Sequence, residues 1–332
     1  MKGAKFKHKP VGALANIIDD FINYKRMQGF KYIIEESTLY RFSVSSQNYQ
    51  FDGLEIPSPL IIEWYKRRPN EKITTFKTRC SNISIFLVYA KDHGYKIDIP
   101  EIPQMHIVDY VPYIFTENEL TAFFNACDSI QPYGGSRRHE IIPILFRLLY
   151  SCGLRSSEAA MLKISDVDLK NGILTIREPK NRKDRYVPMS QLMTAYLRRF
   201  HILAHDIDET GEHYFFQGKY NECLSRHCIY KWFRLCLENA GIPHRGKGFG
   251  PREHDLRHTF CVNSLKAMCE QGMDIYCCLP ILSTYVGHKS IYATQKYLRL
   301  TPEIFPDVLK QITIYAEGII PNIWEVADHE AH

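Results

Sequence analysis

Apolar residues recur at helical spacing through the first hundred positions of the chain. The first such series has steps of three, one and three: Leu14, Ile17, Ile18 and Phe21. Gly29 follows this series and can end its helix. A second series runs from Phe76 to Ala90, with Gly94 as its stop. The pattern predicts a helical first domain over residues 1–96.

The helical pattern is interrupted at residues 97–114, IDIPEIPQMHIVDYVPYI, which carry three prolines. Such a segment is typical of a linker between domains. Thr116 and Glu119 then have the spacing of a capping box, which predicts the start of a helix. The second domain is therefore expected to span residues 115–332.

Within the second domain, helical patterns surround one pair of predicted strands. GILTIRE (172–178) and RYVPM (185–189) are joined by a charged turn of hairpin length. Helices are expected on both sides of this pair, including residues 190–204 and 225–240. We therefore predict a mainly α (α+β) fold with a small antiparallel β-sheet.

The composition is that of a globular chain with a mild positive charge. The net charge is +5 and the pI is about 8.5, which permits a polyanionic partner. No apolar run approaches the ~20 residues that span a bilayer, and no apolar region follows the basic N-terminus. We therefore expect a cytoplasmic protein with reduced cysteines. Zinc ligands are not predicted, because the densest group lacks paired spacing: Cys223, His227, Cys228 and Cys236.

The segment HDLRHTF (254–260) concentrates positive charge on one side of a helix. His254, Arg257 and His258 lie at i, i+3 and i+4, so a helix would point all three the same way. Four further unusual residues lie elsewhere in the second domain: Arg155, Lys180, His288 and Tyr297.

This set of side chains is suited to phosphoryl transfer. Two guanidiniums can hold the non-bridging oxygens of a phosphodiester and stabilise its transition state. A tyrosine is a covalent nucleophile once a base accepts its proton, and a lysine can protonate the leaving oxygen. The sequence has no evident carboxylate group for Mg²⁺, so we predict no cofactor or metal.

Each residue taken singly has a structural explanation. Arg155 can pair with Glu158 on a helix surface, and Lys180 can be a solvated turn residue. Tyr297 can be half-buried packing, and His258 can be a hydrogen-bonded core histidine. The joint pattern favours the chemical interpretation for all of these except His258.

Four separated motifs resemble those of the tyrosine recombinase, or phage integrase, family. They are GLRSSE (153–158), KNRKDRYVP (180–188), HDLRHTF (254–260) and VGHKSIYATQKY (286–297). The resemblance covers about residues 110 to 300. The segment FKTRCSNISIFLVYAKDHGY in the first domain is loosely similar to the core-binding domain of that family.

The resemblance implies a role for each matching residue. Tyr297 would attack the scissile phosphate and form a 3′-phosphotyrosyl bond, while Arg155 and Arg257 hold that phosphate. Lys180 would be the general acid toward the 5′ oxygen. His254 would accept the tyrosine proton or bind the phosphate.

Further matches have supporting roles, and two residues compete with the chosen ones. His288 would contact the phosphate, and Glu158 would orient its neighbours. His258 would support the residues that contact the phosphate without contacting it itself. Tyr292 is a rival nucleophile that the family spacing disfavours, and Lys183 competes with Lys180.

The implied partner is double-stranded DNA at specific recombination sites. Phosphate contacts are expected from two basic segments: Lys72, Thr74, Thr75, Lys77 and Arg79 in the first domain, and Arg245, Lys247 and Arg252 in the second. The family further implies a homotetramer on DNA, joined by exchange of a C-terminal tail (300–332), with accessory proteins possible.

The leading hypothesis is therefore a site-specific recombinase that integrates or excises a mobile element. Two alternatives stay open. A type IB topoisomerase would share the chemistry without strand exchange, and a non-catalytic DNA-binding accessory protein would share only the fold.

Overall fold

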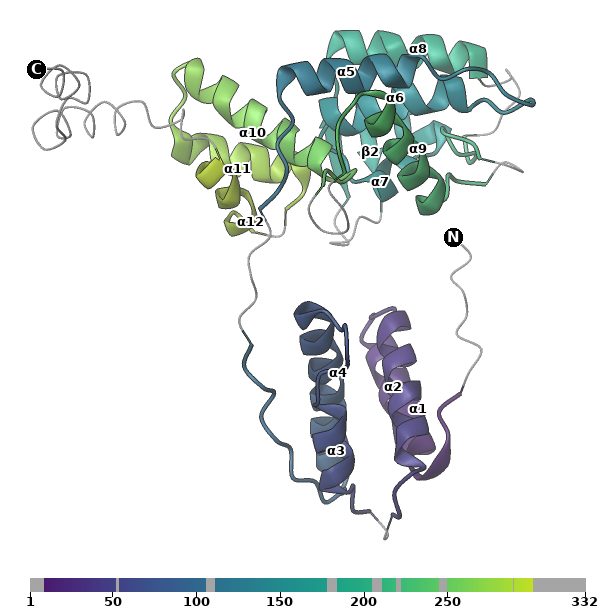
Figure 1. The fold of residues 1–332 in the computed structure, drawn as a ribbon, viewed down its shortest axis with the longest axis vertical. Coiled ribbons are helices and arrows are strands. Elements are labelled where there is room, and N and C mark those ends of the chain that lie inside the picture. The colour runs from purple at the N-terminus through teal and green to yellow at the C-terminus, as the bar shows by residue number, and fades with distance from the viewer. Residues whose placement is uncertain are drawn as a thin grey trace, which may run out of the picture. The chain divides into compact units, whose positions relative to one another are not determined.

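The computed structural model describes residues 9–51, 54–105, 111–177, 184–204, 211–218, 222–244, 250–288 and 290–300. Of residues 299 and 300 it describes the backbone only. The chain divides into two compact units, residues 1–110 and 111–332, which we describe separately (Figure 1).

The first unit is built from helices around an aromatic core. Its elements are η1 (Gly12–Leu14), α1 (Ala15–Met27), α2 (Ile33–Ser46), α3 (Ser58–Trp64) and α4 (Ile73–Asp92). Phe21, Phe42 and Phe86 are fully buried, with ring centroids 5.6 and 6.2 Å from Phe86 to the other two. Gly29 and Gly94, the predicted stops, follow α1 and α4 with φ of +84° and +92°, a conformation that glycine adopts without steric cost.

The proline-rich segment does not act as a linker along its whole length. Ile97 is buried, and Ile99, Ile102 and Met105 pack against the core of the first unit. The boundary between the units, at residues 110 and 111, lies inside the predicted linker 97–114. The apolar residues between the prolines pack on the first unit because they can be buried against its helices.

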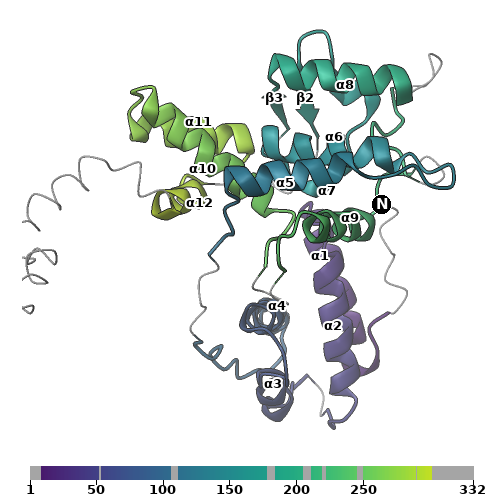
Figure 2. The same cartoon turned by 45° about the horizontal axis from the view of Figure 1, so that its top comes forward.

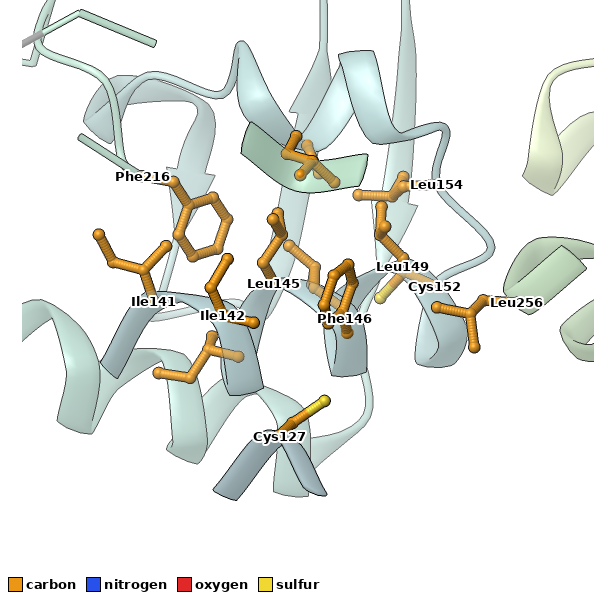
Figure 3. Packing of buried hydrophobic residues seen from close by; sticks show 14 of the residues in the cluster. Cys127, Ile141, Ile142, Leu145, Phe146, Leu149, Cys152, Leu154, Phe216 and Leu256 are labelled. Carbon is orange, nitrogen blue, oxygen red and sulfur yellow. The ribbon is translucent and has the colours of Figure 1, made fainter. Parts of the chain in front are cut away.

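The second unit contains these elements: α5 (Glu117–Asp128), α6 (Arg138–Ser151), α7 (Ser156–Ala160), η2 (Ile164–Asp166), β1 (Val167–Asp168), β2 (Ile173–Ile176), β3 (Arg185–Pro188), α8 (Gln191–Ala204), α9 (Arg226–Asn239), α10 (Asp255–Glu270), α11 (Ile275–Val286), α12 (Tyr292–Gln295) and η4 (Lys296–Leu300). The predicted capping box is present, with the Glu119 amide donating to Thr116 Oγ1 at 3.2 Å. The core surrounds α6, whose apolar side chains meet Phe216 and Cys127 (Figure 3).

The strands form an antiparallel sheet in the order β1-β2-β3. Ile176 pairs with Arg185 at the end of the hairpin that leads into its turn. The sequence pattern missed β1, which has two residues and therefore no readable alternation. Helix α7 ends at Ala160, and the Lys163 amide donates to Asp166 in the following turn.

Helix α10 packs against both α6 and α11, which joins the main core to a second apolar cluster (Figure 2). That cluster contains Cys261 and Leu265 of α10, Leu282 of α11 and the buried ring of Tyr297. Among the described helices, none is both long and apolar enough to cross a membrane. The predicted mainly helical fold with a small antiparallel sheet is confirmed.

Candidate active site

The start of α10 brings together the charged residues of HDLRHTF. His254 is the N-cap residue, and the buried Asp255 accepts a hydrogen bond from the Arg252 amide at 2.7 Å. The rings of His254 and His258 lie 4.7 Å apart in an edge-to-face arrangement. Arg257 turns inward and is 1% exposed, whereas His254 is exposed. The three residues therefore do not share one environment, contrary to what the helical spacing predicted.

Arg257 is held by the backbone of two distant segments. Its Nη1 donates to the Gly153 carbonyl and its Nη2 to the Val286 carbonyl, both at 2.6 Å. Burial and the nearby charge of Arg155 lower the pKa of Arg257 to about 10, so it stays cationic at neutral pH. Within the described residues, its Nε is buried without a hydrogen-bond partner. A buried donor of this kind is costly unless a ligand or water pairs with it.

Arg155 caps α7 and forms a short ion pair with the helix's third residue. Its Nη1 lies 2.6 Å from Glu158 Oε1, and its amide donates to Oε2 at 3.0 Å. Burial would raise the pKa of the Glu158 carboxyl, but hydrogen bonds and charges from Arg185 and Arg155 lower it to about 2. Glu158 is therefore an anion between two cations.

Three arginines donate to three successive carbonyls at the C-terminal end of α11. Arg185 Nε donates to Tyr285 at 3.1 Å, Arg257 to Val286, and Arg155 Nη2 to Gly287 at 3.3 Å. The last carbonyls of a helix have no partners inside the helix and carry its negative dipole end. This helix end therefore anchors both arginines that the sequence predicted.

Sequence reasoning missed Arg185, although a signal was present. Arg185 and Val187 share one face of β3, while Tyr186 between them is 73% exposed. A cation two residues from a buried valine on a short strand points inward by the period of two. An inward cation needs an anion, and Glu158 provides it at 2.8 Å.

Two glycines make these contacts sterically possible. Gly153 has φ of +57°, and a Cβ there would lie 2.5 Å from Phe260 Cδ1. Gly287 has φ of +67°, and a Cβ there would lie 2.9 Å from Arg185 Nη1. Both positions therefore need glycine for backbone conformation and for space.

The hydroxyl of Tyr297 lies 2.9 Å from Nδ1 of His258. The tyrosine is 2% exposed, and burial raises its pKa, with Cys261 in hydrogen-bonding reach of the same hydroxyl. The sequence favoured His254 as the partner of the nucleophile and gave His258 only a supporting place. In this structure His258 makes the direct contact, because the i+4 position lies over η4.

His288 completes the group on the other side of the tyrosine. Its ring stacks with Tyr297 at 6.1 Å between centroids, and its Nδ1 lies 2.8 Å from Thr294 Oγ1. Burial and the charges of the surrounding arginines lower the pKa of His288 to about 3, and burial and Arg257 lower that of His258 to about 4. Partial burial and neighbouring cations also lower the pKa of His254, although it remains exposed.

Several predicted residues lie outside this group. Tyr292, the rival tyrosine, is 78% exposed on α12. Lys180, Arg245, Lys247 and the tail from residue 301 lie outside the described residues. Arg252 is described and exposed, close enough to influence His258 electrostatically.

The first-domain prediction needs one correction. Arg79 is 7% exposed and is fully engaged within its own unit. It forms a 2.9 Å ion pair with Glu71 and donates to the carbonyls of Trp64 and Lys66. A guanidinium committed in this way organises the α3–α4 turn and is not free to bind DNA. Three other predicted contacts are exposed near the start of α4, namely Lys72, Thr74 and Thr75, while Lys77 is partly buried.

Known proteins match this chain over more than half of its length. The model of the phage integrase family matches residues 114–303. The chain is 28% identical to y4rB of Sinorhizobium fredii, whose name classes it as an integrase/recombinase, over 89% of this chain and 95% of that protein. It is 30% identical to the tyrosine recombinase XerA of Pyrococcus furiosus, over 53% of this chain and 58% of that protein.

A solved structure shares the fold. It is the Tn1549 transposon integrase in complex with transposon right end DNA, with a TM-score of 0.62 and 17% identity, covering 85% of this chain and 94% of that one. The matched residues include every motif from GLRSSE to the tyrosine. The chain therefore belongs to the phage integrase family and is a tyrosine recombinase.

Proposed function

We propose that this chain cuts and rejoins DNA strands at specific sites through a covalent 3′-phosphotyrosyl intermediate on Tyr297. One observation carries the proposal: Arg155 and Arg257 are anchored to one helix end, beside a tyrosine flanked by His258 and His288. Two guanidiniums near one phenol match the needs of a phosphodiester under attack.

The proposed step exchanges one ester for another. The Tyr297 oxygen bonds to phosphorus, the bond to the 5′ oxygen breaks, and the phenol proton passes to a histidine. The 5′ oxygen receives a proton, for which Lys180 is the expected donor. A 5′-hydroxyl of a second strand then reverses the sequence and releases the tyrosine.

His258 is the proposed first acceptor of the tyrosine proton. Its lowered pKa keeps the imidazole neutral at pH 7, so an unprotonated Nδ1 can accept the bond that the phenol donates. Tyr297 is buried in this state, so attack requires that the η4 segment exposes it to the phosphate. His254, exposed at the helix start, is then free to bind a phosphate oxygen.

Names of similar proteins support a role in a mobile element. One relative is named as an integrase/recombinase, and one structural neighbour is a transposon integrase bound to transposon DNA. We propose integration or excision of such an element, by a homotetramer that exchanges its C-terminal tails. A plasmid with two sites tests this: recombinant products support exchange, and relaxation alone supports a topoisomerase.

A duplex that is nicked near the cleavage site tests the chemistry. The short strand released by cleavage diffuses away, so a covalent protein–DNA adduct accumulates. Wild type and Tyr292→Phe are expected to form the adduct, and Tyr297→Phe is expected to form none. An adduct with Tyr297→Phe that is absent with Tyr292→Phe would move the nucleophile to Tyr292. If none of the proteins forms an adduct while all bind the duplex, the accessory-protein alternative stands.

A further inference from the structure

Arg185 joins three segments of the second unit at the candidate site. From the first position of β3, its Nη1 and Nη2 lie 3.2 and 2.8 Å from the two oxygens of Glu158. Its Nε donates to the Tyr285 carbonyl at 3.1 Å. The side chain is 10% exposed, so these contacts form inside the protein.

Glu158 transmits the position of Arg185 to Arg155. The same carboxylate oxygens that meet Arg185 also accept from Nη1 and the amide of Arg155, at 2.6 and 3.0 Å. Glu158 has a 4% exposed side chain and is held from both sides. If Arg185 is lost, the Glu158 carboxylate is paired with Arg155 alone. The carboxylate and the Arg155 guanidinium can then rotate together out of their present positions.

The turn after α11 is the second route from Arg185 to the site. Gly287 lies directly against the Arg185 side chain, where a Cβ would meet its Cδ and Cζ at 3.0 Å. Arg155 donates to the Gly287 carbonyl, and His288 is the next residue. The guanidinium of Arg185 therefore supports the turn at Gly287. This turn carries His288 and accepts a hydrogen bond from Arg155, and both of these residues are predicted phosphate ligands.

We propose that Arg185 is a positioning residue for strand cleavage, which sets Arg155 and His288 against the scissile phosphate without touching DNA. This inference rests on the proposed function. Arginine is required because a planar fork can meet both carboxylate oxygens while its Nε meets a carbonyl. A lysine ammonium in the same place keeps the charge but cannot make these contacts together.

The test compares Arg185→Lys and Arg185→Gln with Arg177→Gln as a matched control. Arg177 is the residue after Ile176, the β2 partner of Arg185, and its side chain is 58% exposed and forms an ion pair with Asp166. Single-turnover adduct formation is measured on the nicked duplex at saturating protein. We expect both Arg185 variants to be slower by about 10- to 100-fold, with Kd for the duplex and the thermal midpoint of Arg185→Lys near wild type. Arg177→Gln should match wild type.

A neutral scissile group separates positioning from loss of structure. A methylphosphonate at the cleavage site has less charge for Arg155 to neutralise, so the defect of Arg185→Lys should be much smaller on it. Equal slowing on both substrates, or no slowing on either, would overturn the inference.

Gly287→Ala is a second route to the same question, because it displaces Arg185 without removing charge. It should slow adduct formation with the same substrate dependence as Arg185→Lys. A wild-type rate for Gly287→Ala would count against the inference. Failure of the proposed function has a different signature: Tyr297→Phe would still form an adduct, whatever the Arg185 variants do.

Discussion

The hydroxyl of Tyr297 lies 2.9 Å from Nδ1 of His258, a residue 39 positions earlier in the chain. This contact links the proposed nucleophile to the second histidine of HDLRHTF, while the first histidine lies exposed at the helix start. The choice of proton acceptor between the two histidines is therefore open to a direct experiment.

Replacing His258 with Gln should slow adduct formation, because the amide can accept a hydrogen bond but not the phenol proton. Loss of a general base costs about 10²- to 10⁴-fold in rate. Single-turnover cleavage of the nicked duplex measures this, with His254→Gln in parallel. A wild-type rate for His258→Gln beside a slow His254→Gln would return the role of acceptor to His254.

The histidines also predict how stability depends on pH. The pKa of His258 is lowered in the folded state to about 4, from an unfolded value of about 6.5, so the unfolded chain binds more protons between these values. The free energy of unfolding should therefore fall as the pH drops from 6.5 toward 4. His254 and His288 act in the same direction.

Denaturant melts at pH 7, 6 and 5 measure this effect, and His258→Gln should make the pH dependence shallower. Glu158, whose pKa is lowered from 4.5 to about 2, loses its contribution to stability mainly below pH 4.5, under the lowest pH of these melts. His227→Gln, at an exposed position on α9, is the control for loss of a histidine side chain outside the site. An unchanged slope for His258→Gln would contradict the assigned pKa shift.

Gly153→Ala should destabilise the second unit, because a Cβ would lie 2.5 Å from Phe260 in a left-handed backbone conformation. We expect a loss of about 1–3 kcal/mol in the free energy of unfolding. Adding Phe260→Leu should recover the share of the lost stability that comes from the steric clash. The share that comes from the left-handed backbone conformation should remain. Additive losses in the double variant would show that the two residues do not contact.

Lysines at the start of α4 should contribute to DNA affinity through phosphate contacts. Lys72→Ala and Lys77→Ala should each reduce the slope of log K against log[salt] by about 1. Binding titrations at several salt concentrations test this, with Lys91→Ala, in the last turn of the same helix, as the control. Equal effects of all three substitutions would indicate non-specific attraction.

Arg79→Ala should behave differently from these lysines. It removes one partner of a buried ion pair with Glu71, and such a loss costs about 3–5 kcal/mol of stability. Thermal melting should therefore reveal the defect before any DNA is added. A stable Arg79→Ala protein with weakened DNA binding would restore Arg79 as a phosphate contact.

Local patterns were sufficient for most of the secondary structure. The capping box at Thr116, the Ser225 N-cap and the stops after α1 and α4 depend on residues within a few positions of each other. The sequence was less informative where elements are short, as at β1 and α7, because too few residues carry a period.

The sequence by itself determined which residue types the site contains, because four motifs hold them at recognisable spacings. Only the tertiary structure decided how they pair. Arg185 meets Glu158 and Tyr285 across 27 and 100 positions, and these partners are chosen by the packing of strand against helix. Burial also turned Arg79 inward to Glu71 in the helical first unit, and the packing of α10 against η4 brought His258, rather than His254, to Tyr297. A charged side chain has many acceptable partners along a chain, and burial selects the one that satisfies it.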